Sequence, residues 1–215
     1  MDIYKDIETR TNGEIYIGVV GPVRTGKSTF IKRFMELMVL PAIADENSRK
    51  RAMDELPQSA AGKTVMTTEP KFIPKEAVEV LFEDGVRFQC RLIDCVGYMV
   101  QGAEGHEEDG KERLVKTPWF DYDIPFTKAA EIGTKKVIYD HSTVGIVVTC
   151  DDTVSELGRT SYIQPEMQTI QELKSIGKPF VVLLNSRRPA SPETIELAEK
   201  MEAEYGVSVL PVNCD

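Results

Sequence analysis

Apolar and polar positions along the chain form two recurring patterns, one typical of buried strands and one typical of amphipathic helices. Residues 14–20 form a short apolar run that ends at Gly21, which predicts a buried strand. In residues 28–40 the apolar side chains recur at helical spacing, and Pro41 predicts the end of that helix. The sequence therefore predicts a strand, a glycine-containing loop and a helix that follow one another without a gap.

The middle of the chain is less regular and contains one hairpin pattern. Residues 78–82 and 86–93 are strand-like and flank an Asp-Gly turn. Residues 42–61 predict a loop or an extra helix, and the polar residues 62–74 predict a loop. Residues 98–140 are long, contain glycine and are acidic in their first half, so we interpret them as an insertion that is functional or mobile.

The C-terminal half continues the alternation of strands and helices. Three more apolar runs predict buried strands, at residues 144–149, 180–184 and 207–212. Pro165 is expected to open a helix that runs to Gly177, and Ser191 with Pro192 to begin a helix that ends near Gly206. This alternation predicts an α/β fold with a mostly parallel central sheet, helices on both faces and one antiparallel hairpin.

The loop after the first strand carries the pattern Gly-x-x-x-x-Gly-Lys-Ser, which is typical of phosphate-binding loops. Its glycines let the backbone wrap tightly and aim N–H groups at phosphate oxygens, and the following helix adds its positive end. Lys27 is expected to reach the β- and γ-phosphates, and Ser28 to place its hydroxyl on Mg²⁺. The residues predicted to line the phosphates are Gly21, Val23, Arg24, Thr25, Gly26, Lys27, Ser28 and Thr29.

A second motif follows the hairpin, where a strand ends in an acid and a glycine comes three residues later. Asp94 is expected to hold the water shell of Mg²⁺, and Gly97 to give its N–H to the γ-phosphate. We interpret residues 94–98 as the Walker B motif and the start of a second switch. The predicted metal ligands are Ser28, Thr68 and Asp94.

Two adjacent threonines lie between these motifs. We interpret residues 62–74 as a first switch, because a threonine in such a loop can bind Mg²⁺ through its hydroxyl and the γ-phosphate through its N–H. Thr67 and Thr68 are both candidates for this role and for the catalytic set that they form with Asp94.

Tyr98 stands where many GTPases carry a glutamine that orients the attacking water. Another group must therefore position the water, and the sequence leaves several candidates open. These are Thr67, Thr68, Arg24 and the segment 98–140. Arg24 is equally well explained as a solvated charge.

The segment that follows residues 180–184 occupies the position of base recognition. GTPases usually carry Asn-Lys-x-Asp there, and the Asp accepts two hydrogen bonds from guanine. The aligned residue here is Arg188, which only donates, so ATP suits the site at least as well as GTP. Asn185 is expected to brace the phosphate loop. Asn213, after the last strand, is expected to lie against the nucleotide base.

Composition narrows the class of protein further. The 215 residues are enough for one α/β domain, and a net charge of −9 argues against nucleic acid and anionic lipid as partners. No apolar run has the length of a membrane-spanning helix and the N-terminus has no signal-peptide core, so we expect a cytoplasmic protein. The cysteines form no CxxC pair, and we expect reduced core residues rather than a zinc site; they are Cys90, Cys95, Cys150 and Cys214.

Two sequence motifs are more specific than a general phosphate-loop pattern. Gly-Pro-Val-Arg-Thr-Gly-Lys-Ser-Thr-Phe and Asp-Cys-Val-Gly-Tyr, together with Thr67-Thr68, resemble the stage IV sporulation protein A family, the morphogenetic ATPases of the bacterial spore coat. The resemblance runs from residue 1 to residue 215. It implies a P-loop fold of the GTPase class (TRAFAC type) that hydrolyses ATP. In the family Lys27 would bind ATP, Asp94 would serve Mg²⁺, and Thr67 and Thr68 would be sensor threonines needed for hydrolysis.

The resemblance also implies partners and a place in the cell. ATP hydrolysis would drive assembly of the protein into a polymer at the base of the coat, on the forespore surface in the mother-cell cytoplasm. Family members continue past the ATPase domain, so the chain is expected to be one domain, residues 1–215, of a longer protein. The later regions would connect to a small membrane-anchoring amphipathic peptide and to coat proteins.

Two other functions compete with an ATP-driven assembly protein. A GTP-binding regulatory switch is disfavoured by Arg188, which offers no acceptor to guanine. A metabolic kinase is disfavoured by the hairpin that leads into Asp94, which is an arrangement of the GTPase type.

Overall fold

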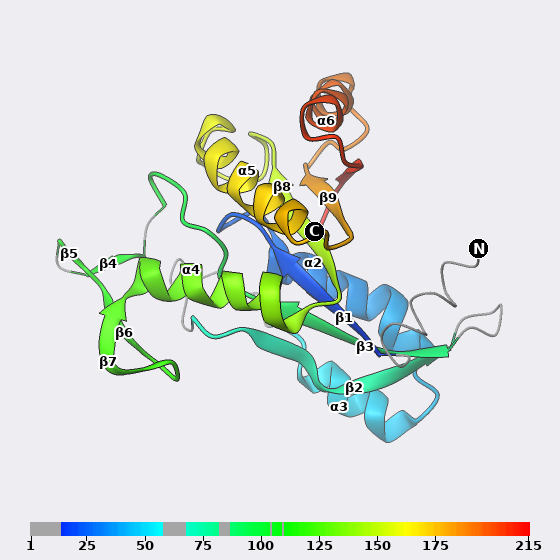
Figure 1. The fold of residues 1–215 in the computed structure, drawn as a ribbon. Coiled ribbons are helices and arrows are strands. Elements are labelled where there is room, and N and C mark those ends of the chain that lie inside the picture. Colours follow the sequence, from blue (N-terminus) through cyan, green and yellow to red (C-terminus); the bar gives the residue numbers. More distant parts are fainter. Residues whose placement is uncertain (1–13, 58–67, 82–86, 104, 109) are drawn as a thin grey trace.

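A six-stranded sheet forms the centre of the computed structural model, which describes residues 14–57, 68–81, 87–103, 105–108 and 110–215. Its strands are β1 (Glu14–Val20), β2 (Lys71–Leu81), β3 (Arg87–Asp94), β8 (Val144–Cys150), β9 (Phe180–Asn185) and β10 (Val209–Val212). They lie in the order β10-β9-β8-β1-β3-β2 (Figure 1). Neighbours are parallel except β2 and β3, so the predicted mostly parallel sheet with one antiparallel hairpin is confirmed.

Helices cover both faces of the sheet (Figure 1). On one face lie α2 (Lys27–Phe34), the π-helix η1 (Met35–Val39), the 3-10 turn η2 (Leu40–Ala42) and α3 (Glu46–Asp54). On the other lie α4 (Phe126–Lys136), the π-helix η3 (Val137–His141), α5 (Thr160–Ser175) and α6 (Pro192–Tyr205). Along β1, Val19 packs into the first layer and Val20 into the second. Burial on both faces explains why the strands are continuous apolar runs.

The first helix continues in a modified form beyond its predicted α-helical pattern. The α-helix ends at Phe34, and the chain stays coiled through η1 and η2 as far as Ala42. Pro41 lies in the first turn of η2, where its missing N–H costs no helical hydrogen bond. The extra helix considered for residues 42–61 exists as α3, which Asp45 caps by accepting a hydrogen bond from the Ser48 N–H.

The segment 98–140, which we interpreted as an insertion, contains regular secondary structure. It contains the short pairs β4 (Glu107–Glu108) with β5 (Lys111–Glu112) and β6 (Leu114–Thr117) with β7 (Phe120–Pro125), followed by α4. The buried residues of α4 recur at helical spacing, but most of them are small, so the apolar pattern is weak; they are Phe126, Ala129, Ala130, Gly133 and Thr134. Gly133 is required there because a Cβ would lie 2.5 Å from the Thr68 carbonyl.

The strand β2 begins at Lys71, inside the range that the sequence assigned to a loop through residue 74. The chain is extended here because Lys71 and Phe72 pair with Asp94 and Ile93 at the end of β3. The turn between β2 and β3 and residues 62–67 of the predicted first switch lie outside the described residues.

Both edges of the sheet contain a proline. Pro74 lies in β2, where the register with β3 shifts between Ile73 and Val78. In β10 the carbonyls of Ser208 and Val212 accept hydrogen bonds from the β9 side, so the alternate residue Pro211 faces the open edge. Proline supplies no N–H to a neighbouring strand.

The helix α5 begins five residues before Pro165, which the sequence took as its start. The added turn is held by Tyr162, which is fully buried, and by Arg159, whose guanidinium donates to both oxygens of Glu166 at 2.7 Å. Glu166 is also buried and accepts from the Tyr205 hydroxyl at 2.6 Å. These contacts outweigh the hydrogen bond that a proline removes from a helix.

The last helix and the cysteines follow the sequence expectations. Ser191 caps α6 by accepting from the Thr194 N–H, Pro192 is its first residue, and Gly206 ends it with φ 61°. All four cysteines are buried and unpaired by disulfides. The strand β10 is two residues shorter at its start than the predicted strand 207–212.

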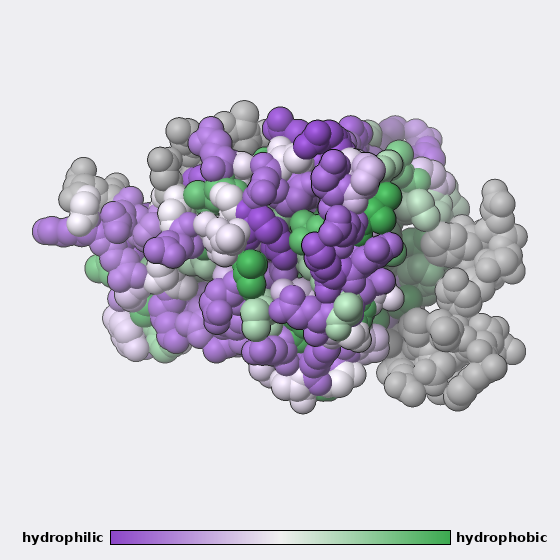
Figure 2. Space-filling view, turned by 90° about the horizontal axis from the view of Figure 1, so that it is seen from above, coloured by the Kyte–Doolittle hydropathy of each residue, from purple (hydrophilic) through white to green (hydrophobic). Residues whose placement is uncertain are grey.

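One face of the molecule is mostly covered by polar side chains (Figure 2). On the face seen in Figure 2, the hydrophobic residues lie in small separate spots. Among the described residues, none of the helices combines the length and the apolar composition needed to cross a lipid bilayer.

Candidate nucleotide site

The phosphate loop joins the end of β1 to the start of α2 at the carboxyl edge of the parallel strands. Its backbone turns through left-handed conformations at Gly21, Arg24 and Gly26, with φ values of 129°, 62° and 96°. Such turns direct successive N–H groups into one hollow, and α2 adds its positive end there. At Gly26 a side chain is excluded, because a Cβ would lie 2.5 Å from the Asn185 amide nitrogen.

Lys27 is the cation of this hollow. It is 5% exposed, and its Nζ donates to the Pro22 carbonyl at 2.5 Å, across the loop. Burial lowers the pKa of the Lys27 ammonium from its ordinary value. A buried positive charge held over a ring of backbone N–H groups is suited to an anion such as a polyphosphate.

Ser28 and Asp94, assigned to the metal from separate parts of the sequence, are in direct contact. The Ser28 hydroxyl donates to Oδ2 of Asp94 at 2.6 Å. Oδ1 of Asp94 is buried and has no hydrogen-bond partner within the described residues. Burial raises the pKa of the Asp94 carboxyl, against the opposing hydrogen bond from Ser28 and the charge of Lys27. A hydroxyl and a carboxylate with an unused buried oxygen fit Mg²⁺, which prefers oxygen ligands and retains several waters.

The start of the second switch is joined to the phosphate loop by backbone hydrogen bonds. The Tyr98 N–H donates to the Gly21 carbonyl at 3.2 Å, and the Val23 N–H donates to the Tyr98 carbonyl at 2.9 Å. Gly97 has φ 97°, and a Cβ there would lie 2.7 Å from the Lys27 Nζ. Gly97 therefore lies against the phosphate loop, as its predicted role requires.

The Tyr98 side chain points away from that loop. It is 4% exposed, and its hydroxyl donates to Glu172 on α5. Burial and this hydrogen bond raise the pKa of the Tyr98 hydroxyl. Tyr98 is thus a packing residue at the position where many GTPases place a water-orienting glutamine, in agreement with the sequence interpretation.

The two threonines of the first switch are placed only in part. Thr68 is buried, and its carbonyl lies against Gly133 of α4. Thr67 lies outside the described residues. The catalytic and metal roles of this pair remain predictions from the sequence.

Asn185 braces the phosphate loop, as predicted. Its Nδ2 donates to the Thr25 carbonyl at 3.0 Å, and its Oδ1 accepts from the Cys214 N–H at 3.1 Å. Asn213 is exposed, with its Oδ1 bonded to the Asp215 N–H at 2.9 Å. Arg188 is exposed as well, and its N–H donates to the Ser186 hydroxyl at 3.0 Å. The segment after β9 is therefore adjacent to the phosphate loop, as base recognition needs.

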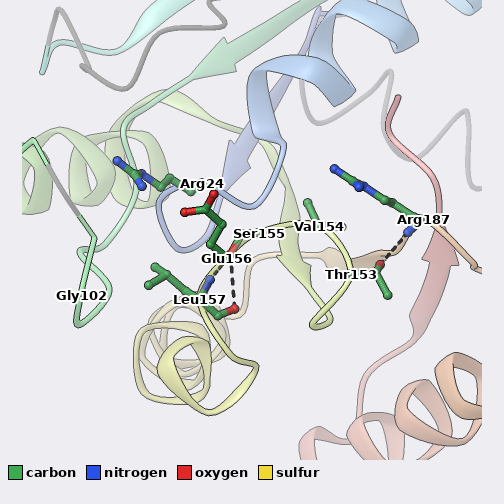
Figure 3. Close-up of a pocket in the computed structure, with 8 residues that line it drawn as sticks. All are labelled: Arg24, Gly102, Thr153, Val154, Ser155, Glu156, Leu157 and Arg187. Carbon is green, nitrogen blue, oxygen red and sulfur yellow. Dashed lines mark hydrogen bonds between the residues drawn. The ribbon is translucent and has the colours of Figure 1, made fainter.

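A cavity of about 620 Å³ opens beside these two loops. It is lined by Arg24, Gly102, Thr153, Val154, Ser155, Glu156, Leu157 and Arg187. Figure 3 shows Arg24 of the phosphate loop and Arg187 of the segment after β9 on opposite sides of the loop 153–157. Arg24, for which the sequence left two roles open, therefore lines a cavity that also borders the segment after β9.

The family model described as "Stage IV sporulation protein A, ATPase domain" matches residues 1–215, the whole chain. The chain belongs to this family. The resemblance inferred from the residues of two sequence motifs is therefore confirmed over residues 1–215. A P-loop fold, the Lys27–Ser28–Asp94 site and membership of the stage IV sporulation protein A ATPase family together make it a nucleotide hydrolase domain.

Relatives of the stage IV sporulation protein A family are similar along the entire chain. Stage IV sporulation protein A of Bacillus subtilis (strain 168) is 54% identical over 215 residues, which are 100% of this chain and 44% of that protein. The protein of the same name from Clostridioides difficile (strain 630) is 58% identical over 212 residues, 99% of this chain and 43% of that protein. The chain thus spans less than half the length of these relatives.

A solved structure outside the family supports the fold. A dimerization-deficient mutant of Toc33 from Arabidopsis thaliana superposes with a TM-score of 0.50 and 13% identity, covering 99% of this chain and 75% of that chain. At this identity the likeness concerns the fold alone.

Sequence reasoning missed one residue of this edge of the sheet. Asp151 follows β8 and is 7% exposed, and its carboxylate accepts from the Thr194 hydroxyl at the start of α6. A signal for it exists in the sequence, because an acid directly after a buried parallel strand lies at the same edge as the phosphate loop. It was overlooked because no nucleotide-binding motif includes it.

Proposed function

We propose that this domain binds ATP with Mg²⁺ and hydrolyses it. The observation that carries the proposal is the contact between Ser28 and Asp94 beside the buried Lys27, which places a metal-binding pair next to a phosphate-binding cation. When bound, Mg²⁺ would neutralise the charge that develops on the phosphate oxygens. Ser28 and Asp94 would hold it, with Thr68 as the further ligand predicted from the sequence.

We also propose that hydrolysis drives self-assembly of the longer protein. The support is family membership, together with a phosphate loop and second switch that share backbone hydrogen bonds and can respond to the γ-phosphate. The polymer would form the base of the spore coat on the forespore surface, in the mother-cell cytoplasm. A small membrane-anchoring amphipathic peptide and coat proteins would bind regions outside this chain, and nucleic acid would not be a partner.

Dependence on Mg²⁺ tests the site directly. Hydrolysis is expected to cease when the metal is chelated and to return on adding Mg²⁺. Asp94→Asn is expected to raise the Mg²⁺ concentration for half-maximal hydrolysis roughly tenfold, the effect typical of weakened metal positioning. Phosphate release measured across a Mg²⁺ titration would show this. Asp123→Asn, on the exposed strand β7, removes the same charge far from the edge loops and serves as control. An unchanged Mg²⁺ requirement in folded Asp94→Asn would reject the metal assignment.

Selectivity for the base separates this proposal from the alternative, a GTP-binding regulatory switch. We expect ATP hydrolysis with little gain on changing to GTP, because Arg188 offers donors only and Ser186 is short. The ratio of kcat/KM for ATP and GTP under one Mg²⁺ and salt condition measures it. A GTP preference of a hundredfold or more, about 2.7 kcal/mol at 1.36 kcal/mol per tenfold, would put the switch function first.

A further inference from the structure

The Asp151 carboxylate is the centre of a hydroxyl cluster that the nucleotide motifs do not include. Its Oδ1 accepts from the Thr153 N–H at 2.8 Å and from the Thr153 hydroxyl at 2.5 Å. Its Oδ2 is 3.4 Å from the Thr194 hydroxyl, at the start of α6. Burial alone would raise the pKa of Asp151, but hydrogen bonds from Ser186 and Thr153 outweigh it and hold the pKa below its ordinary value.

This cluster fixes the segment where the base is expected. The Arg187 N–H donates to the Thr153 hydroxyl at 2.8 Å, and the Arg188 N–H donates to the Ser186 hydroxyl at 3.0 Å. The two hydroxyls lie 3.4 Å apart, next to Asp151. The Asp151 N–H itself donates to the Asn185 carbonyl at 3.1 Å. Two consecutive N–H groups of the segment after β9 are thus held through hydroxyls that adjoin one carboxylate.

Only an acceptor suits the centre of this cluster. The Thr153 hydroxyl can accept from Arg187 because it gives its own hydrogen to Asp151. An amide in place of the carboxylate would keep one acceptor oxygen for Thr153 and would place an NH2 group where Oδ2 accepts from the Thr194 hydroxyl. The Thr194 hydroxyl would then lose its acceptor, and the negative charge that strengthens the bonds from Thr153 would be gone.

The segment held in this way carries Arg187 to the cavity beside the phosphate loop. Arg187 lines that cavity together with Thr153, and its guanidinium lies opposite Arg24 (Figure 3). The cavity volume of about 620 Å³ is in the range of small-ligand sites. A guanidinium at its mouth can stack on the face of a purine and donate to ribose hydroxyls.

We propose that Asp151 is a positioning residue for the nucleoside half of the site, and that it acts through Thr153 to hold Arg187 in contact with the bound nucleoside. The inference rests on the nucleotide-binding function proposed above. It divides the site into two parts. Lys27 and the phosphate loop bind the triphosphate, whereas Asp151 and Arg187 affect only ligands that carry a nucleoside.

The test compares two ligands on the same protein, ATP and inorganic triphosphate, each with Mg²⁺. Both compete with a fluorescent ATP analogue in equilibrium titrations. Asp151→Asn and Arg187→Ala are expected to weaken ATP about tenfold or more, as for loss of a hydrogen bond in a charged network. Inorganic triphosphate should change less than about twofold in both variants. In hydrolysis, KM for ATP should rise while kcat changes less than about twofold.

Controls keep the possible failures apart. Asp123→Asn should leave both affinities unchanged, and Thr153→Val should reproduce the selective loss. If Asp151→Asn does not fold, Thr153→Val and the exposed Arg187→Ala decide the matter. Unchanged ATP affinity in the folded variants, or equal weakening of both ligands, would overturn the inference. A wild-type domain that binds neither ligand would instead reject the proposed nucleotide function.

Discussion

Lys27→Ala is expected to lose nearly all binding of nucleoside triphosphate. Lys27 is a buried ammonium within the phosphate loop, and its charge would be shared between the β- and γ-phosphates. Each charge-assisted hydrogen bond from an ammonium to a phosphate oxygen is worth about 1.5–3 kcal/mol, so removing two of them lowers the affinity by at least about a hundredfold. Equilibrium binding of labelled ATP to the folded variant measures this decrease.

A control on the same helix separates local chemistry from net charge. Lys32→Ala also removes one positive charge from α2, but Lys32 lies near the surface beside Glu36, 3.9 Å away. The Lys32→Ala variant should bind ATP with the same affinity as the unaltered domain. Normal affinity in a folded Lys27→Ala protein would remove the phosphate-loop assignment altogether.

The double change Thr67→Ala with Thr68→Ala is expected to stop turnover and to leave binding largely intact. Most ground-state affinity lies in the phosphate loop, whereas a switch threonine acts on the γ-phosphate and its metal as hydrolysis proceeds. Loss of an interaction made mainly in the transition state lowers kcat more than it weakens binding. Phosphate release under saturating ATP, with ATP affinity measured in parallel, checks both halves of the expectation.

Thr160→Ala is the matched control for this pair, because Thr160 is exposed at the start of α5. Its turnover should equal that of the unaltered domain. Folding of the double variant needs its own measurement, since Thr68 is buried and packs against Gly133. Hydrolysis at the normal rate in the folded double variant would show that the first switch lies elsewhere.

The sheet and its helical layers were predictable because strands that are buried on both faces consist of consecutive apolar residues. Residues 62–67 of the first switch, which include Thr67, and the hairpin turn lie outside the described residues, so those predictions stand untested. Where helices were missed or began elsewhere than predicted, the packing of particular residues decides where they lie. Gly133 makes room for a backbone carbonyl, and Arg159 and Glu166 support a turn ahead of Pro165.

The site was predictable to the extent that single residues carry a recognised role. Lys27, Ser28 and Asp94 meet as expected, and Asn185 braces the loop through Thr25. The Asp151 cluster was not predictable, because its hydroxyls come from three separate segments of the chain. Only the fold brings those segments together, and serine and threonine are too common for their order to give a signal.

The prolines at the two edges of the sheet limit how copies of this domain can join. A protein filament can grow by adding the edge strand of one copy to the edge strand of the next, as a continuous β-ladder. Pro211 presents no N–H on the open side of β10, and β2 carries Pro74 and a register shift at the other edge. Both ends of the sheet are therefore poor templates for another strand. Where copies of this domain contact one another in the assembly that we propose, we therefore expect the contacts at loops and helix surfaces rather than between edge strands.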